Sequence, residues 1–84
     1  MIITRMQKVL RDFAFTEVDM SKAIMGASLM DDLGLSSLSL ILLICDLEEE
    51  FDIEIPQEDL YGFETLGDVH AYLCERLNRD ESLP

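Results

Sequence analysis

The sequence predicts a small all-α protein, a four-helix bundle made of three main helices and one short helix. Two observations support this fold class. Apolar residues recur at helical spacing in three stretches, and serine, threonine, proline and glycine stand near the expected helix ends. The 84 residues suffice for one domain, and 49% of them are apolar, so they can form a single compact core. We therefore expect one domain over residues 1–84.

The first helix is expected over about residues 2–15, and a long loop over residues 16–35. Charged residues separate the apolar residues that define this helix, which are Ile3, Met6, Val9, Leu10 and Phe13. The loop shows no sustained period and contains two glycines. Leu29 and Leu33 should anchor the loop to the core, because an unanchored loop of this length is unusual in so small a domain.

The second main helix is expected over about residues 36–51, with Ser36 as its N-cap, because a serine hydroxyl can accept a backbone N–H of the first turn. On a helical wheel with Ser37 at zero, the apolar residues fall on two arcs. The arc between about 240° and 340° is the expected core face, with Leu40, Leu43, Ile44, Leu47 and Phe51. The arc between about 40° and 140°, called the second arc below, holds Leu38, Ile41, Leu42 and Cys45.

A bundle this small cannot easily bury both arcs of one helix. Two interpretations of the second arc are open: it packs under the long loop, or it is an exposed patch that a partner covers. Each such side chain could contribute about 1.5–3 kcal/mol when a partner buries it, before the costs of association. Four of them suffice for weak, transient docking.

Two further helices are expected near the end of the chain. A short one should run over about residues 56–61, with Pro56 as its first residue. The last helix should run over about residues 66–78. Thr65 and Asp68 are predicted to form a capping box at its start, because each side chain can accept a backbone N–H from the other residue.

The charge of the chain narrows the classes of partner. Eighteen acidic and six basic residues give a net charge of −12, and residues 23–75 contain no lysine or arginine. Such a surface repels phosphate backbones and anionic lipids, so neither nucleic acid nor membrane is an expected partner. A basic protein surface is the natural complement. The first residues do not form a signal peptide, and the longest apolar run, residues 40–45, is far shorter than a membrane span, so a cytoplasmic protein is expected.

No set of residues predicts catalysis or metal binding. Cys45 and Cys74 lie 29 positions apart without a metal-binding pattern, so reduced thiols are expected. His70 is the only histidine, and it has no serine or cysteine partner in a recognisable arrangement. The adjacent carboxylates Asp31 and Asp32 point apart, and the acidic run at residues 48–50 lacks the order of a calcium-binding loop. We expect no metal site and no enzymatic activity.

Two blocks of the sequence closely resemble the acyl carrier proteins. Residues 32–38 read D-L-G-L-S-S-L, where the family has D-L-G-x-D-S-L. Residues 47–56 read L-E-E-E-F-D-I-E-I-P, where the family has L-E-E-E-F-x-x-x-I-P. The blocks stand at the spacing of the family, and the similarity covers most of residues 28–73.

This resemblance implies that Ser37 receives a covalent 4′-phosphopantetheine arm, which a phosphopantetheinyl transferase takes from coenzyme A. A hydroxyl at a helix start suits this role, because the phosphodiester would lie beside free backbone N–H groups at the positive end of the helix dipole. The protein would be a monomeric carrier that holds intermediates as thioesters and presents them to a loading enzyme and to downstream enzymes with basic docking patches. The expected docking residues are Leu38, Ile41, Leu42, Cys45, Asp46, Glu48 and Glu49.

Three positions depart from the fatty-acid carriers. Ser36 replaces the usual acid before the modified serine, while Ser39 and Leu42 stand where those carriers place acids for docking. We expect partner specificity to differ at Ser39 and Leu42, and we expect a specialised fatty-acid or polyketide-type pathway. An aminoacyl or peptidyl carrier of a nonribosomal-peptide-type pathway is an alternative. An unmodified interaction module that kept the fold is a second alternative.

Overall fold

The computed structural model describes residues 2–14 and 17–77. Its elements are α1 (Ile2–Arg11), η1 (Met20–Lys22), α2 (Ser37–Phe51), η2 (Gln57–Gly62) and α3 (Leu66–Arg76), where η denotes a 3-10 helix. The described residues form no strand, only one isolated β-bridge between Ser28 and Thr65. The predicted all-α bundle of three main helices and one short helix is confirmed, and η1 is an additional turn inside the predicted loop.

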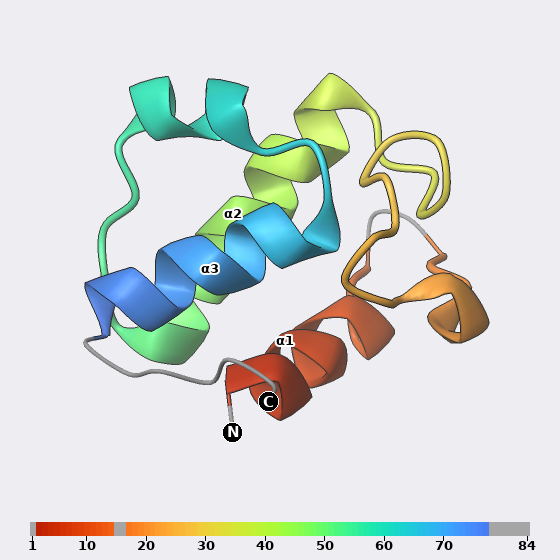
Figure 1. The fold of residues 1–84 in the computed structure, drawn as a ribbon, viewed down its shortest axis with the longest axis horizontal. Helices are drawn as coiled ribbons and strands as arrows, with labels where there is room; N and C mark the ends of the chain where they lie inside the picture. Colours follow the sequence, from red (N-terminus) through yellow and green to blue (C-terminus); the bar gives the residue numbers. More distant parts are fainter. Residues whose placement is uncertain (1, 15–16, 78–84) are drawn as a thin grey trace.

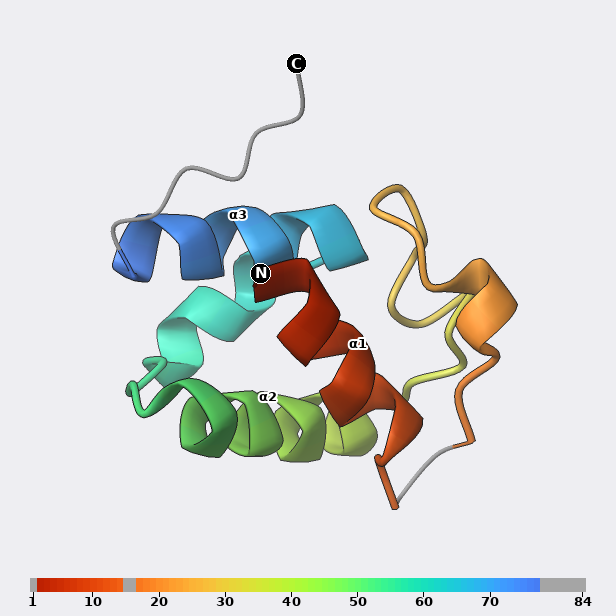
Figure 2. The same ribbon diagram turned by 90° about the horizontal axis from the view of Figure 1, so that it is seen from below.

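The helices surround one apolar core. Figure 1 shows α1 and η2 on opposite sides of the crossed pair α2 and α3. Figure 2 shows the long segment between α1 and α2 folded beside one end of the bundle, with η2 at the other end. α1 packs against both α2 and α3. In the described part of the chain, no helix is long and apolar enough to cross a membrane.

The first helix is shorter than predicted. α1 ends at Arg11, and the N–H of Phe13 bonds to the carbonyl of Leu10 across three residues, which tightens the backbone into a turn. Phe13 is nevertheless buried in the core. The position of Phe13 in the apolar period therefore indicated that its side chain is buried, and not that the residue is helical. The predicted helix ends at residues 15 and 78 lie outside the described residues.

The long loop is anchored to the core, as predicted, and it is also bonded to the start of α3, which was not predicted. Leu29 and Leu33 are buried, and the N–H of Leu29 bonds to the carbonyl of Glu64. The N–H of Gly67 bonds to the carbonyl of Met25 at 2.7 Å. A Cβ atom at Gly67 would lie 2.8 Å from that same oxygen, so only glycine allows the loop to approach α3 this closely.

The predicted capping box of α3 is present. The Asp68 carboxylate accepts the N–H groups of Glu64 and Thr65, each at 3.0 Å, and the Thr65 hydroxyl accepts the N–H of Asp68 at 3.2 Å. The N–H groups of Thr65 and Glu64 stabilise the charged carboxylate and lower the pKa of Asp68 below its usual value. Ionised Asp68 therefore supports the start of α3.

We expect Asp68→Asn to lower the free energy of unfolding at pH 7, with a loss that shrinks as the pH falls below about 4. The sign follows from the lowered pKa: the stabilisation is complete above the pKa of the unfolded chain, and it is lost as the pH falls through the folded value. Urea unfolding at pH 7 and at low pH measures the difference. Glu54→Gln, at an exposed position, is the matched control. An undiminished difference at low pH would contradict this account.

Candidate functional site

The site centres on Ser37, the first residue of α2. Gly34, with φ of 74°, turns the chain toward the helix in a conformation that favours glycine. The preceding Ser36 is the N-cap, as predicted, and forms a capping box with Ser39. The Ser36 hydroxyl accepts the N–H of Ser39 at 3.2 Å, and the Ser39 hydroxyl accepts the N–H of Ser36 at 2.7 Å. The Ser37 side chain is exposed and makes no hydrogen bond with the described residues.

Ser39 has an internal role that corrects its expected place at a partner surface. Its residue is only 6% exposed, and its hydroxyl bonds to the backbone and the side chain of Ser36. A helical wheel cannot show that the third helical residue closes the cap and is thereby buried. Leu42 is half-buried and packs partly against the core. Neither side chain is freely presented to a partner.

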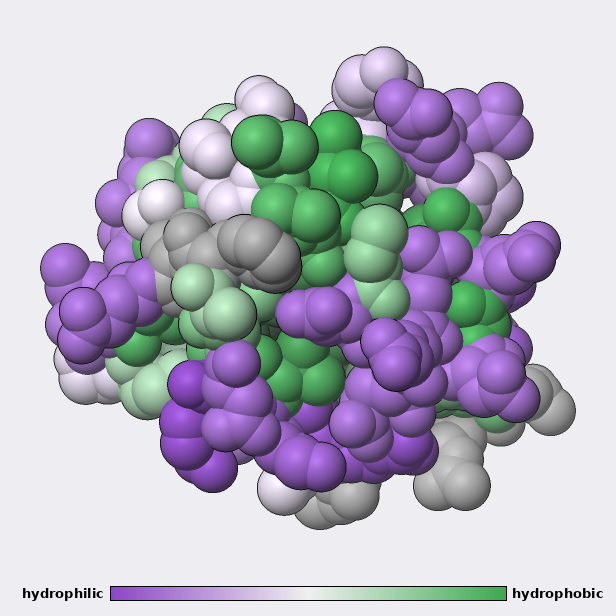
Figure 3. All heavy atoms as spheres, turned by 180° about the vertical axis from the view of Figure 1, so that it is seen from behind, coloured by the Kyte–Doolittle hydropathy of each residue, from purple (hydrophilic) through white to green (hydrophobic). Residues whose placement is uncertain are grey.

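The two arcs of α2 differ in burial. Every residue of the predicted core arc is buried. On the second arc, Leu38 is 67% and Ile41 40% exposed, and Cys45 is exposed as well. Figure 3 shows apolar side chains gathered on the face behind that of Figure 1, with hydrophilic side chains beside them. Three members of the second arc are therefore exposed instead of packing under the loop.

The acidic residues toward the end of α2 are not equivalent. Glu48 is half-buried and its carboxylate accepts the N–H of Ile55 at 2.9 Å, so it closes the turn after the helix. Glu50 pairs with the Arg5 guanidinium at 2.9 Å and with Lys8 at 3.9 Å. Asp46 is half-buried and Glu49 is exposed. Of the predicted docking acids, Glu49 is therefore the most accessible.

Arg5 offsets the concentration of negative charge at this end of α2. The last turn of the helix holds no basic residue, although the helix dipole is negative there. The Arg5 guanidinium also donates to the carbonyl of Glu50 and lies 4.4 Å from the centre of the Phe51 ring. This side chain from α1 thus supplies the missing positive charge.

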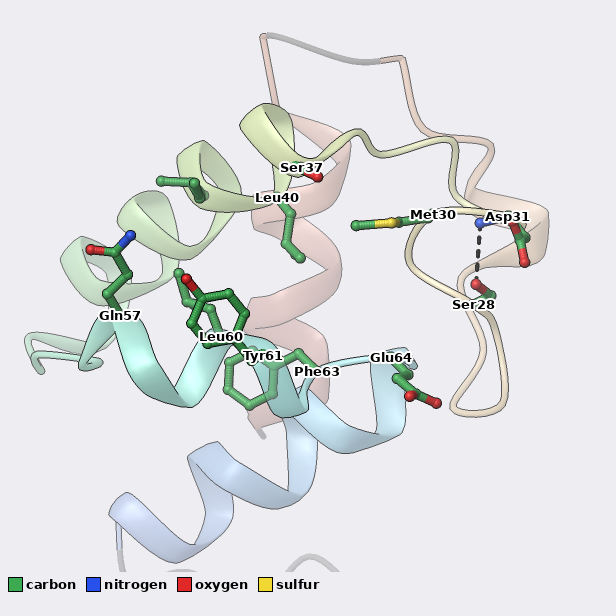
Figure 4. A pocket seen from close by; sticks show the side chains of 11 residues that line it. Ser28, Met30, Asp31, Ser37, Leu40, Gln57, Leu60, Tyr61, Phe63 and Glu64 are labelled. Atoms are coloured by element: carbon green, nitrogen blue, oxygen red, sulfur yellow. Dashed lines mark hydrogen bonds between the residues drawn. The ribbon is translucent and has the colours of Figure 1, made fainter.

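A pocket of about 500 Å³ opens beside Ser37. It lies between α2, η2 and the long loop, and Figure 4 shows the Met30, Leu40 and Leu60 side chains around it. Its lining is mainly apolar. It comprises Ser28, Met30, Asp31, Ser37, Leu40, Ile41, Gln57, Leu60, Tyr61, Phe63 and Glu64. The sequence does not predict this pocket, because its walls come from three segments with no shared period.

The remaining candidate residues are not brought to Ser37. His70 is buried on α3, and its Nε2 lies 3.6 Å from the Sγ of half-buried Cys74. Neither residue lines the pocket. Among residues 2–14 and 17–77, no group of three or more His, Cys, Asp and Glu side chains could hold a metal ion. Neither histidine nor lysine is among the described residues that line the pocket beside Ser37.

Comparison with known proteins identifies relatives of this chain. The family model described as "Phosphopantetheine attachment site" matches residues 24–73. The chain is 47% identical over 55 residues to an acyl carrier protein of Clostridium perfringens, which covers 66% of this chain and 72% of the relative. It is 48% identical over 56 residues to an acyl carrier protein of Bdellovibrio bacteriovorus, which covers 67% of this chain and 72% of the relative.

Proposed function

Since this chain belongs to the acyl carrier protein family, whose prosthetic group is covalently attached 4′-phosphopantetheine, we propose that Ser37 is the attachment residue and that the protein carries acyl intermediates on the arm. One observation carries this proposal. Of the paired serines at the start of α2, Ser36 is engaged in the cap while the Ser37 hydroxyl is exposed and free of hydrogen bonds with the described residues.

The residues around Ser37 fit a 4′-phosphopantetheine arm. The first two residues of a helix, here Ser37 and Leu38, have N–H groups with no carbonyl partner inside the helix. These N–H groups and the positive end of the α2 dipole suit a phosphodiester on the Ser37 oxygen. When bound, the arm supplies a thiol that holds cargo as a thioester. The chain itself contributes position and binding, since the described residues that line the pocket beside Ser37 include no histidine or lysine to activate the hydroxyl.

The pocket supports an apolar acyl cargo from a fatty-acid or polyketide-type pathway. It begins at Ser37, and its walls include Leu40, Ile41, Leu60 and Phe63. Burying about 25 Å² of apolar surface contributes roughly 0.6 kcal/mol, so each methylene that enters this lining favours retention of the chain. A charged aminoacyl group would lose its hydration against these apolar walls, and it would have to reach Asp31 or Glu64 of the lining to find a charged partner. We therefore favour acyl over aminoacyl cargo.

Partner enzymes are proposed to dock on the exposed part of the second arc. Leu38, Ile41 and Cys45 supply apolar contact area next to the arm, and Glu49 supplies accessible negative charge. The net charge of −12 favours enzymes with basic patches, because opposite charges speed encounter and orient the partners. The transferase and the loading enzyme are expected to share this surface.

Intact-mass spectrometry tests the proposed function. Unmodified protein is incubated with coenzyme A and a broad-range phosphopantetheinyl transferase, and a gain of one arm is expected. The modified protein is then offered to malonyl transferases and to adenylating enzymes, and loading by the former is expected. A protein that gains no mass would contradict the carrier function, and loading only by adenylating enzymes would contradict the proposed cargo class.

A further inference from the structure

Tyr72 of α3 joins η2 through a short chain of polar contacts. Its hydroxyl donates to the Asp59 carboxylate of η2 at 2.7 Å and accepts a hydrogen bond from the Arg76 guanidinium at 2.7 Å. The Tyr72 ring also packs edge to face against the Phe63 ring, with the ring centres 5.2 Å apart and the ring planes at 79°. Burial and the Asp59 carboxylate raise the pKa of Tyr72, so the phenol keeps its proton and remains a donor at neutral pH.

Other contacts hold η2 only weakly. None of its six residues is buried, and its N-cap, Pro56, makes no side-chain hydrogen bond to the first turn. Leu60 packs partly against the core, whereas Tyr61 is 82% exposed. A 3-10 helix also has poorer hydrogen-bond geometry than an α-helix. One strong contact to α3 therefore has a large share in the position of η2.

The same short helix forms a wall of the pocket. Gln57, Leu60 and Tyr61 line it, whereas Asp59 does not. Asp59 thus connects η2 to Tyr72 while its neighbours contact the cargo space. Any movement of η2 away from α3 changes the distance between this wall and the opposite wall on α2.

We infer that Tyr72 is a positioning residue that holds η2 through Asp59 and thereby sets the width of the pocket beside Ser37. The selection of cargo by size, which follows from this, rests on the proposed function. When η2 is released, the width of the pocket is no longer defined. The pocket then protects the thioesters of long and short acyl chains from cleavage to a similar degree. Tyr72 does not line the pocket itself. It acts on the pocket through the hydrogen bond to η2 and through Phe63, the lining residue that its ring meets edge to face.

Hydrogen exchange on the unmodified protein tests the positioning role without the arm. In Tyr72→Phe and in Asp59→Ala, we expect the amides of η2 to exchange about tenfold faster, while those of α1 and α2 keep their rates. The double variant should exchange no faster than either single variant, because both remove the same hydrogen bond. Glu58→Gln, an exposed neighbour on η2, is the control and should match the parent protein. Unchanged η2 rates, or equal acceleration in all helices, would overturn the inference.

Cleavage of loaded thioesters by hydroxylamine tests the effect on the pocket. Butyryl and decanoyl groups are attached to the arm of the parent protein and of Tyr72→Phe. We expect the parent to protect the decanoyl thioester more than the butyryl one, and the variant to lose most of that difference. A difference that persists although η2 exchanges faster would overturn the link between Tyr72 and pocket width. Failure of the arm to attach would instead count against the proposed function, and the exchange result would still decide the role of Tyr72.

Discussion

Ser37→Ala is expected to abolish attachment of the 4′-phosphopantetheine arm completely. The substitution removes the only atom of this residue that can form the phosphodiester, and alanine is well tolerated at the start of a helix. Because the Ser37 hydroxyl makes no hydrogen bond with the described residues, the fold should be unaffected. Intact mass after incubation with coenzyme A and a transferase measures the result, and circular dichroism verifies the helices.

Ser36→Ala is the matched control for this experiment. It makes the same change one residue earlier and leaves the Ser37 hydroxyl in place. Loss of the N-cap should lower the free energy of unfolding by about 1 kcal/mol, because the N–H of Ser39 loses its acceptor. The variant should nevertheless accept the arm. A mass gain in Ser37→Ala, or its loss in a folded Ser36→Ala protein, would contradict the assignment of Ser37.

Leu43→Ala is expected to cost about 2–5 kcal/mol of stability, a large part of the roughly 5–15 kcal/mol that holds a typical domain together. Leu43 is 2% exposed and belongs to the core face of α2. Its truncation removes buried methyl groups and leaves a cavity that the neighbouring helices cannot fully close. Urea unfolding followed by circular dichroism measures the loss.

Leu38→Ala provides the comparison on the same helix. Leu38 is 67% exposed, so the same truncation should change the free energy of unfolding by no more than about 0.5 kcal/mol. It should instead weaken modification by the transferase, since it removes apolar surface next to Ser37. Equal loss of stability in the two variants would show that the second arc is buried after all, contrary to its exposure here.

Local chemistry explains which predictions held. Ser36 caps α2, and Thr65 with Asp68 caps α3, because a cap depends on side chains within three residues of the helix start. The two apolar arcs of α2 followed from residue order alone, since each residue advances the helix by about 100°. The exposure of the second arc is seen only in the folded chain. Only Leu42 lies between the two classes, half-buried at the edge of the exposed face.

Predictions failed where the same sequence pattern is compatible with two different local structures. Phe13 continues the apolar period of α1, yet it lies in a turn after the helix has ended. Apolar spacing records which side chains are buried, and a turn can bury a side chain as well as a helix can. Ser39 was expected at a partner surface, but it is buried and its hydroxyl closes the α2 cap. Glu48 accepts the N–H of Ile55 and stays a predicted docking residue.

Residue order alone predicted the helical class, Ser36 as the cap of α2, the Thr65–Asp68 capping box, the two apolar arcs of α2 and the position of Ser37 near a helix start. All of these depend on contacts between residues near one another in the chain. Long-range packing alone brings Met30, Leu40 and Leu60 around one pocket and Asp59 to Tyr72. Such pairs are brought together by the packing of whole helices, and no local periodicity records which distant side chains will meet.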